Sequence, residues 1–156
     1  VKAAEKAKGT DIKVIVIGHQ HWFTTPPQKF KPENAEKLIA LGAEVNIGSD
    51  VLTNSIRQKE RLGASPLSII TQILSSLKLK VNVEIVLKAT DAGLLQPGER
   101  VISLAGSHSG IDTAVVLVAN QTANILDIKL NEIIAIPLTR EKADASYLQA
   151  RNPPKL

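Results

Sequence analysis

Apolar residues in this chain gather in short runs rich in valine and isoleucine, separated by longer polar or amphipathic stretches. The runs Val14–Ile17, Ala43–Ile47 and Glu132–Pro137 predict strands, because β-branched side chains fit a pleated sheet. Val101–Leu104 and Ala114–Val118 are two further apolar runs, which predict strands that are buried on both faces. The pattern therefore predicts a sheet with a largely aliphatic core.

Three other segments carry the signals that start and stop helices. Val1–Lys8 is rich in alanine and is followed by Gly9, a residue typical of helix ends. Pro32–Leu41 has proline in its first turn and Gly42 after its last. Ser65–Lys78 opens with a serine N-cap and a proline at the first helical position. We expect a helix in each segment.

The element type stays open in two further segments. Lys80–Leu95 alternates apolar and polar residues, which favours a strand, yet Glu84 and Lys88 are spaced as an i,i+4 pair of a helix. Leu52–Leu62 is polar and fits a helix or a loop. Arg140–Ala150 can form a terminal helix.

Strands that alternate with helices predict a single α/β domain with a mostly parallel sheet, covered by helices on both faces. In such sheets ligands bind beyond the carboxyl ends of the strands. The polar segments Gly18–Thr25, Gly48–Asp50 and Ala105–Thr113 follow strands in this way. These three loops are the first places to look for a site.

Composition limits the chemistry that the chain can perform. The 156 residues include no cysteine, which excludes disulfides, thiolate metal ligands and cysteine nucleophiles. The net charge of +4 comes without a Lys/Arg-rich run, so no nucleic-acid partner is expected. No apolar run is long enough to span a membrane, so neither a membrane partner nor a location other than the cytoplasm is expected.

The loop between Val101–Leu104 and Ala114–Val118 consists mostly of small and polar residues. Gly106 and Gly110 permit backbone angles that side chains forbid and let a ligand approach the main chain. Ser107, Ser109 and Thr113 add hydroxyls, and successive backbone N–H groups can bind an anion. One hypothesis is a phosphate-binding loop. The other is a glycine-rich hairpin turn without a ligand.

All three histidines lie in the candidate loops. His19 and His21 point the same way in an extended segment and could form a metal pair, completed by His108 or Asp50. The alternatives are hydrogen bonds to a ligand or a surface position without a role. Trp22 either stacks on a flat ligand ring or packs against its own loop.

Several segments together resemble one family, the stand-alone proteins similar to the C-terminal α/β domain of pyruvate kinase. The segments that carry the resemblance are Ile15–Phe23, Lys31–Glu33, Ala89–Leu94, Ala105–Val116 and Asp127–Pro137. The match extends from about Lys13 to Leu138, and Gly106–Thr113 is its most specific part. Gly18 and Trp22 depart from the family pattern, which usually has threonine and glycine there.

The resemblance implies a three-layer α/β/α sandwich with a mostly parallel sheet, and a helix over Lys80–Leu95. It implies no pyruvate kinase activity, because the catalytic barrel belongs to another domain. It also implies a site for a phosphorylated ligand such as flavin mononucleotide (FMN). The family begins with a strand and a serine-rich loop ahead of the helix that opens this chain, and we expect both to be lacking here.

Our first hypothesis is therefore a binding module for a phosphorylated small molecule or nucleotide, with no metal. Its expected ligand-binding residues are His19, His21, Trp22, Ser49, Gly106, Ser107, Ser109, Gly110 and Thr113. A rival hypothesis is an enzyme that uses the loop histidines as acid and base or as metal ligands. A third is a structural domain that forms a homo-oligomer through the apolar segment Val81–Leu95.

Overall fold

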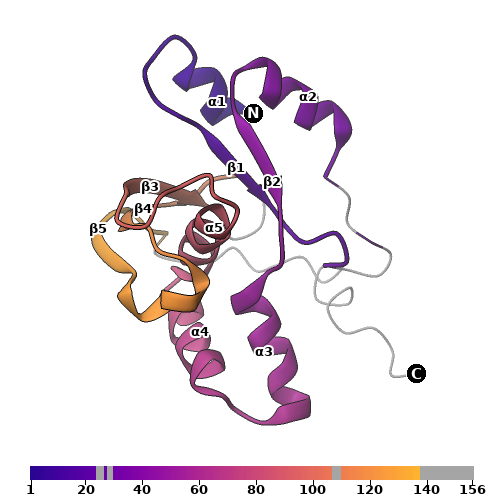
Figure 1. Cartoon of the computed structure of the whole chain (residues 1–156), viewed down its shortest axis with the longest axis vertical. Coiled ribbons are helices and arrows are strands. Elements are labelled where there is room, and N and C mark those ends of the chain that lie inside the picture. The colour runs from indigo at the N-terminus through magenta and orange to yellow at the C-terminus, as the bar shows by residue number, and fades with distance from the viewer. Residues whose placement is uncertain (24–26, 28–29, 107–109, 138–156) are drawn as a thin grey trace. The chain divides into compact units, whose positions relative to one another are not determined.

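The computed structural model describes residues 1–23, 27, 30–106 and 110–137, with 57–62 described by their backbone alone. Helices and strands are mixed along the chain, as expected (Figure 1). The described residues fall into two compact units, 1–49 and 50–137. That the whole chain forms a single domain stays a prediction.

The first unit contains two helices and two strands. Its elements are α1 (Lys2–Ala7), β1 (Ile15–Gly18), α2 (Pro32–Ala40) and β2 (Glu44–Ile47). The strands pair in parallel, and the buried residues Ala4, Leu38 and Ala43 form the core beside them. Pro32 starts α2 and Gly42 follows it at φ +81°, which confirms both helix signals.

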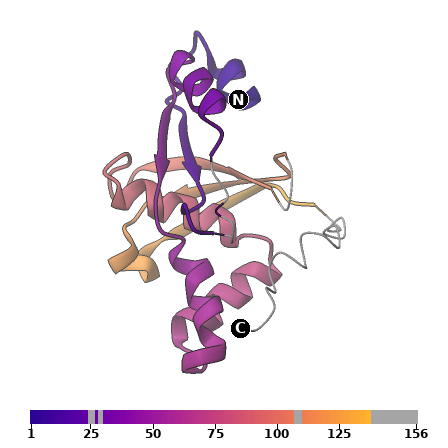
Figure 2. The ribbon, with the colours of Figure 1, turned by 90° about the vertical axis from the view of Figure 1, so that its right-hand side faces the viewer.

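The second unit contains three α-helices, a 3₁₀ helix and three strands. Its elements are α3 (Val51–Leu62), α4 (Pro66–Ser76), α5 (Lys80–Asp91), β3 (Arg100–Ala105), β4 (Thr113–Val118), η1 (Thr122–Asp127) and β5 (Lys129–Ala135). The sheet has the order β3-β4-β5 and is antiparallel throughout. Helix α5 packs against β3 and β4 (Figure 2). The sequence did not predict η1.

The mostly parallel sheet and the three-layer sandwich are not shown. Among the described residues, parallel pairing is confined to β1 and β2. Strands β3 and β4 form a hairpin that closes at the pair Ala105–Thr113. A loop of a few residues can join antiparallel strands, whereas parallel strands need a long crossover. Alternation of elements along the chain did not reveal the direction of these strands.

Burial on both faces is confirmed for β4 and wrong for β3. In β4, Val115, Val116 and Leu117 are all buried. In β3, Ile102 and Leu104 are 64% and 40% exposed, while Ser103 between them is buried. Strand β3 therefore buries only one of its faces within the described structure.

Helix α5 covers Lys80–Asp91 of the segment Lys80–Leu95, so the helix that the resemblance implies is confirmed there and the strand that its alternation favours is wrong. Helix α5 buries nearly every residue from Asn82 to Thr90. A helix that is buried on most sides does not need the one-sided apolar stripe of a surface helix. Its apolar and polar residues can then alternate in sequence and still lie inside the unit. The segment Leu52–Leu62 is also helical, and Arg140–Ala150 lies outside the described residues.

Strand β5 lies at the edge of the three-stranded sheet. All its residues are exposed, including Leu130, Ile133 and Ile134. Its register with β4 shifts twice, between Ala114 and Val115 and between Val116 and Leu117. Such irregularities bend and twist an edge strand.

Helix α4 buries two polar residues and exposes two isoleucines. Ser68 and Thr71 are buried, while Ile69 and Ile73 are exposed. The helix starts as expected, because the Ser65 hydroxyl accepts a hydrogen bond from the Ser68 amide at 3.1 Å. In return, the Ser68 hydroxyl accepts a hydrogen bond from the Ser65 amide at 2.9 Å. This reciprocal pair is a capping box in which serine takes the usual place of glutamate.

Replacing Ser65 tests how much this cap stabilises the second unit. We expect Ser65→Ala to lower the free energy of unfolding by about 1 kcal/mol, since the Ser68 amide loses its acceptor. Ser76 is the matched control. Its exposed hydroxyl donates to the Ile73 carbonyl three residues before it in the same helix, and Ser76→Ala should change stability by less than about 0.5 kcal/mol. Urea denaturation measures both. Equal values for the two variants would contradict the prediction.

Candidate functional site

The aromatic residues after β1 form two ring pairs. The ring of His19 stacks on the ring of Phe23, with centroids 4.1 Å apart and planes 23° from parallel. The ring of His21 meets Trp22 edge to face at 5.6 Å. Phe23 is buried, whereas Trp22 is 67% exposed. Phe23 thus anchors the loop and His19, while Trp22 presents its indole to the outside.

Ser49 lies at the same end of the parallel pair as these rings. The register pairs Gly18 of β1 with Ile47 of β2, so the two strands end side by side. His19 follows one strand end, and Ser49 follows the other two residues later. The structure therefore brings the aromatic loop and Ser49 to the carboxyl end of the two-stranded sheet, where a ligand is expected.

The other predicted site residues belong to the hairpin of the second unit. Gly110 has φ +81°, a conformation that disfavours any residue with a β-carbon. A β-carbon on Gly106 would collide with the carbonyl oxygen of Gly110. Both glycines are therefore required by the backbone. Ser107 and Ser109 lie outside the described residues.

Thr113 sits at the base of the hairpin and is buried. Its hydroxyl donates to the Asp112 carboxylate at 2.7 Å, and the Asp112 amide donates to the Ala105 carbonyl at 3.0 Å. The second of these bonds fastens the end of the loop to β3, whereas the first joins two neighbouring residues. Thr113 thus has a structural role, and its expected contact with a ligand stays a prediction.

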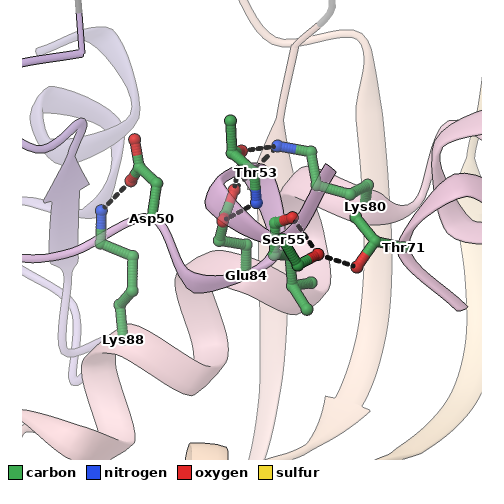
Figure 3. A network of polar contacts seen from close by, with 8 residues as sticks. Asp50, Thr53, Ser55, Thr71, Lys80, Glu84 and Lys88 are labelled. Carbon is green, nitrogen blue, oxygen red and sulfur yellow. Dashed lines mark hydrogen bonds and ion pairs between the residues drawn. The ribbon is translucent and has the colours of Figure 1, made fainter. Parts of the chain in front are cut away.

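The second unit contains a network of buried polar groups whose pairing the sequence did not predict (Figure 3). Lys88 Nζ lies 2.5 Å from Asp50 Oδ1, and the two side chains are 5% and 2% exposed. Asp50 directly precedes α3, and Lys88 lies on α5. Removing one partner of such a buried ion pair strongly destabilises the folded protein, because the remaining charge cannot reach water.

A second group of contacts joins the same two helices (Figure 3). The Thr53 amide and hydroxyl donate to the two oxygens of Glu84 at 2.8 and 2.9 Å. Lys80 Nζ reaches the Thr53 hydroxyl at 2.6 Å and Glu84 Oε2 at 2.8 Å. Both oxygens of the Glu84 carboxylate are hydrogen-bonded. This arrangement positions α3 on α5 and leaves Glu84 engaged in structure.

Hydroxyl contacts extend the network to α4. Ser55 Oγ lies 3.2 Å from Thr71 Oγ1, and both groups are buried. Ser55 also donates to the Leu52 carbonyl, and Thr71 donates to the Leu67 carbonyl, each at 2.7 Å. The inward polar face of α4 thus has its partner on α3.

The sequence contained one signal for this network. Glu84 and Lys88 stand within an otherwise apolar stretch, and their spacing indicated an ion pair with each other. The structure pairs Glu84 with Lys80 and Lys88 with Asp50 instead. Asp91 near the end of α5 is also structural, since it accepts hydrogen bonds from the amide and the hydroxyl of Thr122.

The part of the chain that the structure describes lacks two other features that could indicate a function. Within the residues that the structure describes, no group of three or more histidine, aspartate or glutamate side chains could hold a metal ion. No helix of that part is long and apolar enough to cross a membrane. A comparison of the sequence with models of protein families found no match.

Removing the lysine tests the buried ion pair. We expect Lys88→Met to reduce the free energy of unfolding by about 3–5 kcal/mol, because Asp50 would stay buried without its cation. The double variant Asp50→Asn/Lys88→Met should lose less than the sum of the single changes. Chemical denaturation of all three variants checks both statements. Additive losses would show that the two side chains are not coupled.

Lys13 provides the matched control. Its ion pair with Glu44 has a distance of 3.2 Å, but the two side chains are 52% and 45% exposed. Lys13→Met should therefore change stability by less than about 1 kcal/mol. A loss as large as that of Lys88→Met would mean that burial does not explain the difference.

Proposed function

We propose that this chain is a binding module for a phosphorylated small molecule, which it holds at the β3–β4 hairpin loop. The observation that carries the proposal is the backbone of that loop. Gly110 has a positive φ, and Gly106 has no room for a β-carbon beside the Gly110 carbonyl. The loop therefore excludes side chains at two positions where a phosphate needs close access to the main chain.

Backbone N–H groups and hydroxyls supply the chemistry that a phosphate requires. Successive amides in a loop with alternating backbone handedness form a concave anion site. The serines at 107 and 109 would add two hydroxyl donors. At the described end of the loop, the Asp112 amide donates to the Ala105 carbonyl and holds the chain on β3.

The resemblance to the pyruvate kinase C-terminal domain family supports the same proposal. It favours FMN or a similar nucleotide as the ligand and argues against pyruvate kinase catalysis. The three-layer sandwich is a further proposal that rests on the resemblance, whereas the cytoplasmic location and self-association are proposals that rest on the sequence. The expected contact through Val81–Leu95 is not among them, because helix α5 already buries nearly every residue from Asn82 to Thr90. His19, His21, Trp22 and Ser49 remain proposed contacts of the loops after β1 and β2.

A thermal shift assay with matched ligands tests the proposal. FMN should raise the melting temperature of the full chain, whereas riboflavin, which lacks the phosphate, should raise it much less. Ribose 5-phosphate separates phosphate recognition from ring recognition. If none of the three compounds moved the melting temperature, the proposed ligand class would be wrong.

Gly110→Val tests the role of the loop backbone. A β-branched residue at φ +81° is strongly disfavoured, so we expect a stability loss on the order of 1–3 kcal/mol. Binding of FMN should fall below detection, because the bulky side chain would obstruct the approach of the phosphate to the main chain. Denaturation and FMN titration of the same sample measure both effects.

Gly98 is the control for backbone strain alone. It has φ +90° in the turn before β3, and open space surrounds the place of its missing β-carbon. Gly98→Val should cost a similar amount of stability and leave FMN affinity unchanged. If both variants lost FMN binding equally, the effect of Gly110→Val would reflect general destabilisation.

Ser107→Ala tests the hydroxyl contribution. It removes one donor from the predicted phosphate site, so we expect weaker FMN binding by about tenfold. Stability should change by less than about 1 kcal/mol, as is usual for a loop hydroxyl. Isothermal titration calorimetry measures the affinity. Unchanged affinity would remove Ser107 from the site.

A further inference from the structure

An apolar stripe runs along the outer side of helix α4. Ile69 and Ile73 lie on the helix and Leu77 is its C-cap residue, so the three follow one another at intervals of four. Residues at this spacing lie above one another on one helix face. Their side chains are 53%, 54% and 52% exposed. No residue of α4 is charged, which is the reverse of what a helix face toward water usually carries.

Helix α4 cannot rotate to bury this stripe. Thr71 on its other side is buried, and its hydroxyl lies 3.2 Å from the Ser55 hydroxyl of α3. Ser68 is also buried and forms the capping box with Ser65. These polar contacts hold the helix in one rotation and leave the stripe outward. A cover for the stripe must therefore come from outside the described residues.

The end of strand β5 brings the chain back to this helix. Lys78 directly follows Leu77, and its Nζ donates a hydrogen bond to the Pro137 carbonyl. The residues 138–156 follow Pro137 in the sequence and lie outside the described residues. They therefore begin beside the C-terminal end of the stripe.

The sequence after Pro137 has the length and the pattern to cover the stripe. The expected helix over residues 140–150 has as many residues as α4, which has 11. Within such a helix, Ala143, Tyr147 and Ala150 share one face at the spacing i, i+4, i+7. Its charged residues fall at the other positions 140, 141, 142 and 144. Small alanines opposite large aliphatic side chains let two helices approach closely.

We propose that residues 140–150 form an amphipathic helix that packs on the stripe of α4 and runs antiparallel to it. The direction follows from the starting point, since the segment begins at the C-terminal end of α4 and must run toward its N-terminal end to cover the whole stripe. Ala143 then faces Leu77. Tyr147 faces Ile73 in the middle, and Ala150 faces Ile69.

The connection through Pro137 favours this segment over a second copy of the chain. Lys78 holds the start of the segment at the stripe, so the contact is intramolecular. A short flexible connection gives an effective concentration of roughly millimolar. A second copy in a micromolar solution competes at a far lower concentration for the same uncharged face.

Paired cysteines test the contact and its direction, because the chain has no cysteine of its own. Ile69→Cys with Ala150→Cys should form an intramolecular disulfide at least about tenfold faster than Ile69→Cys with Ala143→Cys. In the proposed packing Ala143 lies beside Leu77, about 12 Å along the axis from Ile69, and a disulfide spans less than about 7 Å between Cα atoms. Mass spectrometry after timed oxidation measures both rates. Equal rates, or a faster second pair, would overturn the proposal.

The single variant Ile73→Cys tests for a second copy. Ile73 is the middle residue of the stripe, so antiparallel pairing of two copies would place it opposite itself. We expect no covalent dimer under the same oxidation, because the segment 140–150 covers this position. A covalent dimer would assign the stripe to a second copy and overturn the proposal.

Tyr147 reports on the contact without any introduced cysteine, because it is the only tyrosine of the chain. Incorporated 3-fluorotyrosine therefore gives one ¹⁹F signal. Ile73→Glu should move this signal to its position in the urea-unfolded chain, since a charge at the centre of the stripe expels the segment. Ile12→Glu is the control: Ile12 is 66% exposed in the first unit, and the signal should stay in place. An unchanged signal in Ile73→Glu would overturn the proposal even if the cysteine variants did not fold.

Discussion

Burial of charge between α3 and α5 determines where the other parts of the second unit lie. Asp50 holds Lys88, and Thr53 holds Glu84, so α5 has one position and one rotation relative to α3. From that position Asn82 reaches Ser103 and fixes β3. The sheet and its hairpin loop thus depend on polar contacts that tolerate little displacement. Apolar packing alone would accept several rotations of a helix that is buried on most sides.

Local signals in the sequence were sufficient for elements that begin and end at a distinctive residue. Ser65 and Gly42 act through bonds and angles within a few positions, and both boundaries were predicted. Strand direction depends on which strands pair, and local signals do not reveal that. The antiparallel hairpin between Ala105 and Thr113 was therefore not predicted. Helix α5 was misread by alternation because its surroundings, rather than its own periodicity, determine which residues are buried.

In the candidate site, too, the features that depend on nearby residues were predictable, and those that depend on distant residues were not. The special backbone at Gly110 follows from a glycine in a short polar loop, and the structure gives it a positive φ. The partner of Lys88 lies 38 residues away, and no local spacing could identify it. The contact between Asn82 and Ser103 is likewise a property of packing, because the two residues lie 21 positions apart.

The irregular edge strand β5 has a consequence for how this protein avoids aggregation. An exposed strand with apolar side chains can template pairing with a strand of another molecule. The register with β4 passes over Asn131 and Ile134, which interrupts the regular spacing that such pairing needs. Lys129 and Glu132 add charges to the same strand, and charge on an edge opposes association. The bulges of β5 thus protect a surface whose composition alone would promote fibre-like assembly.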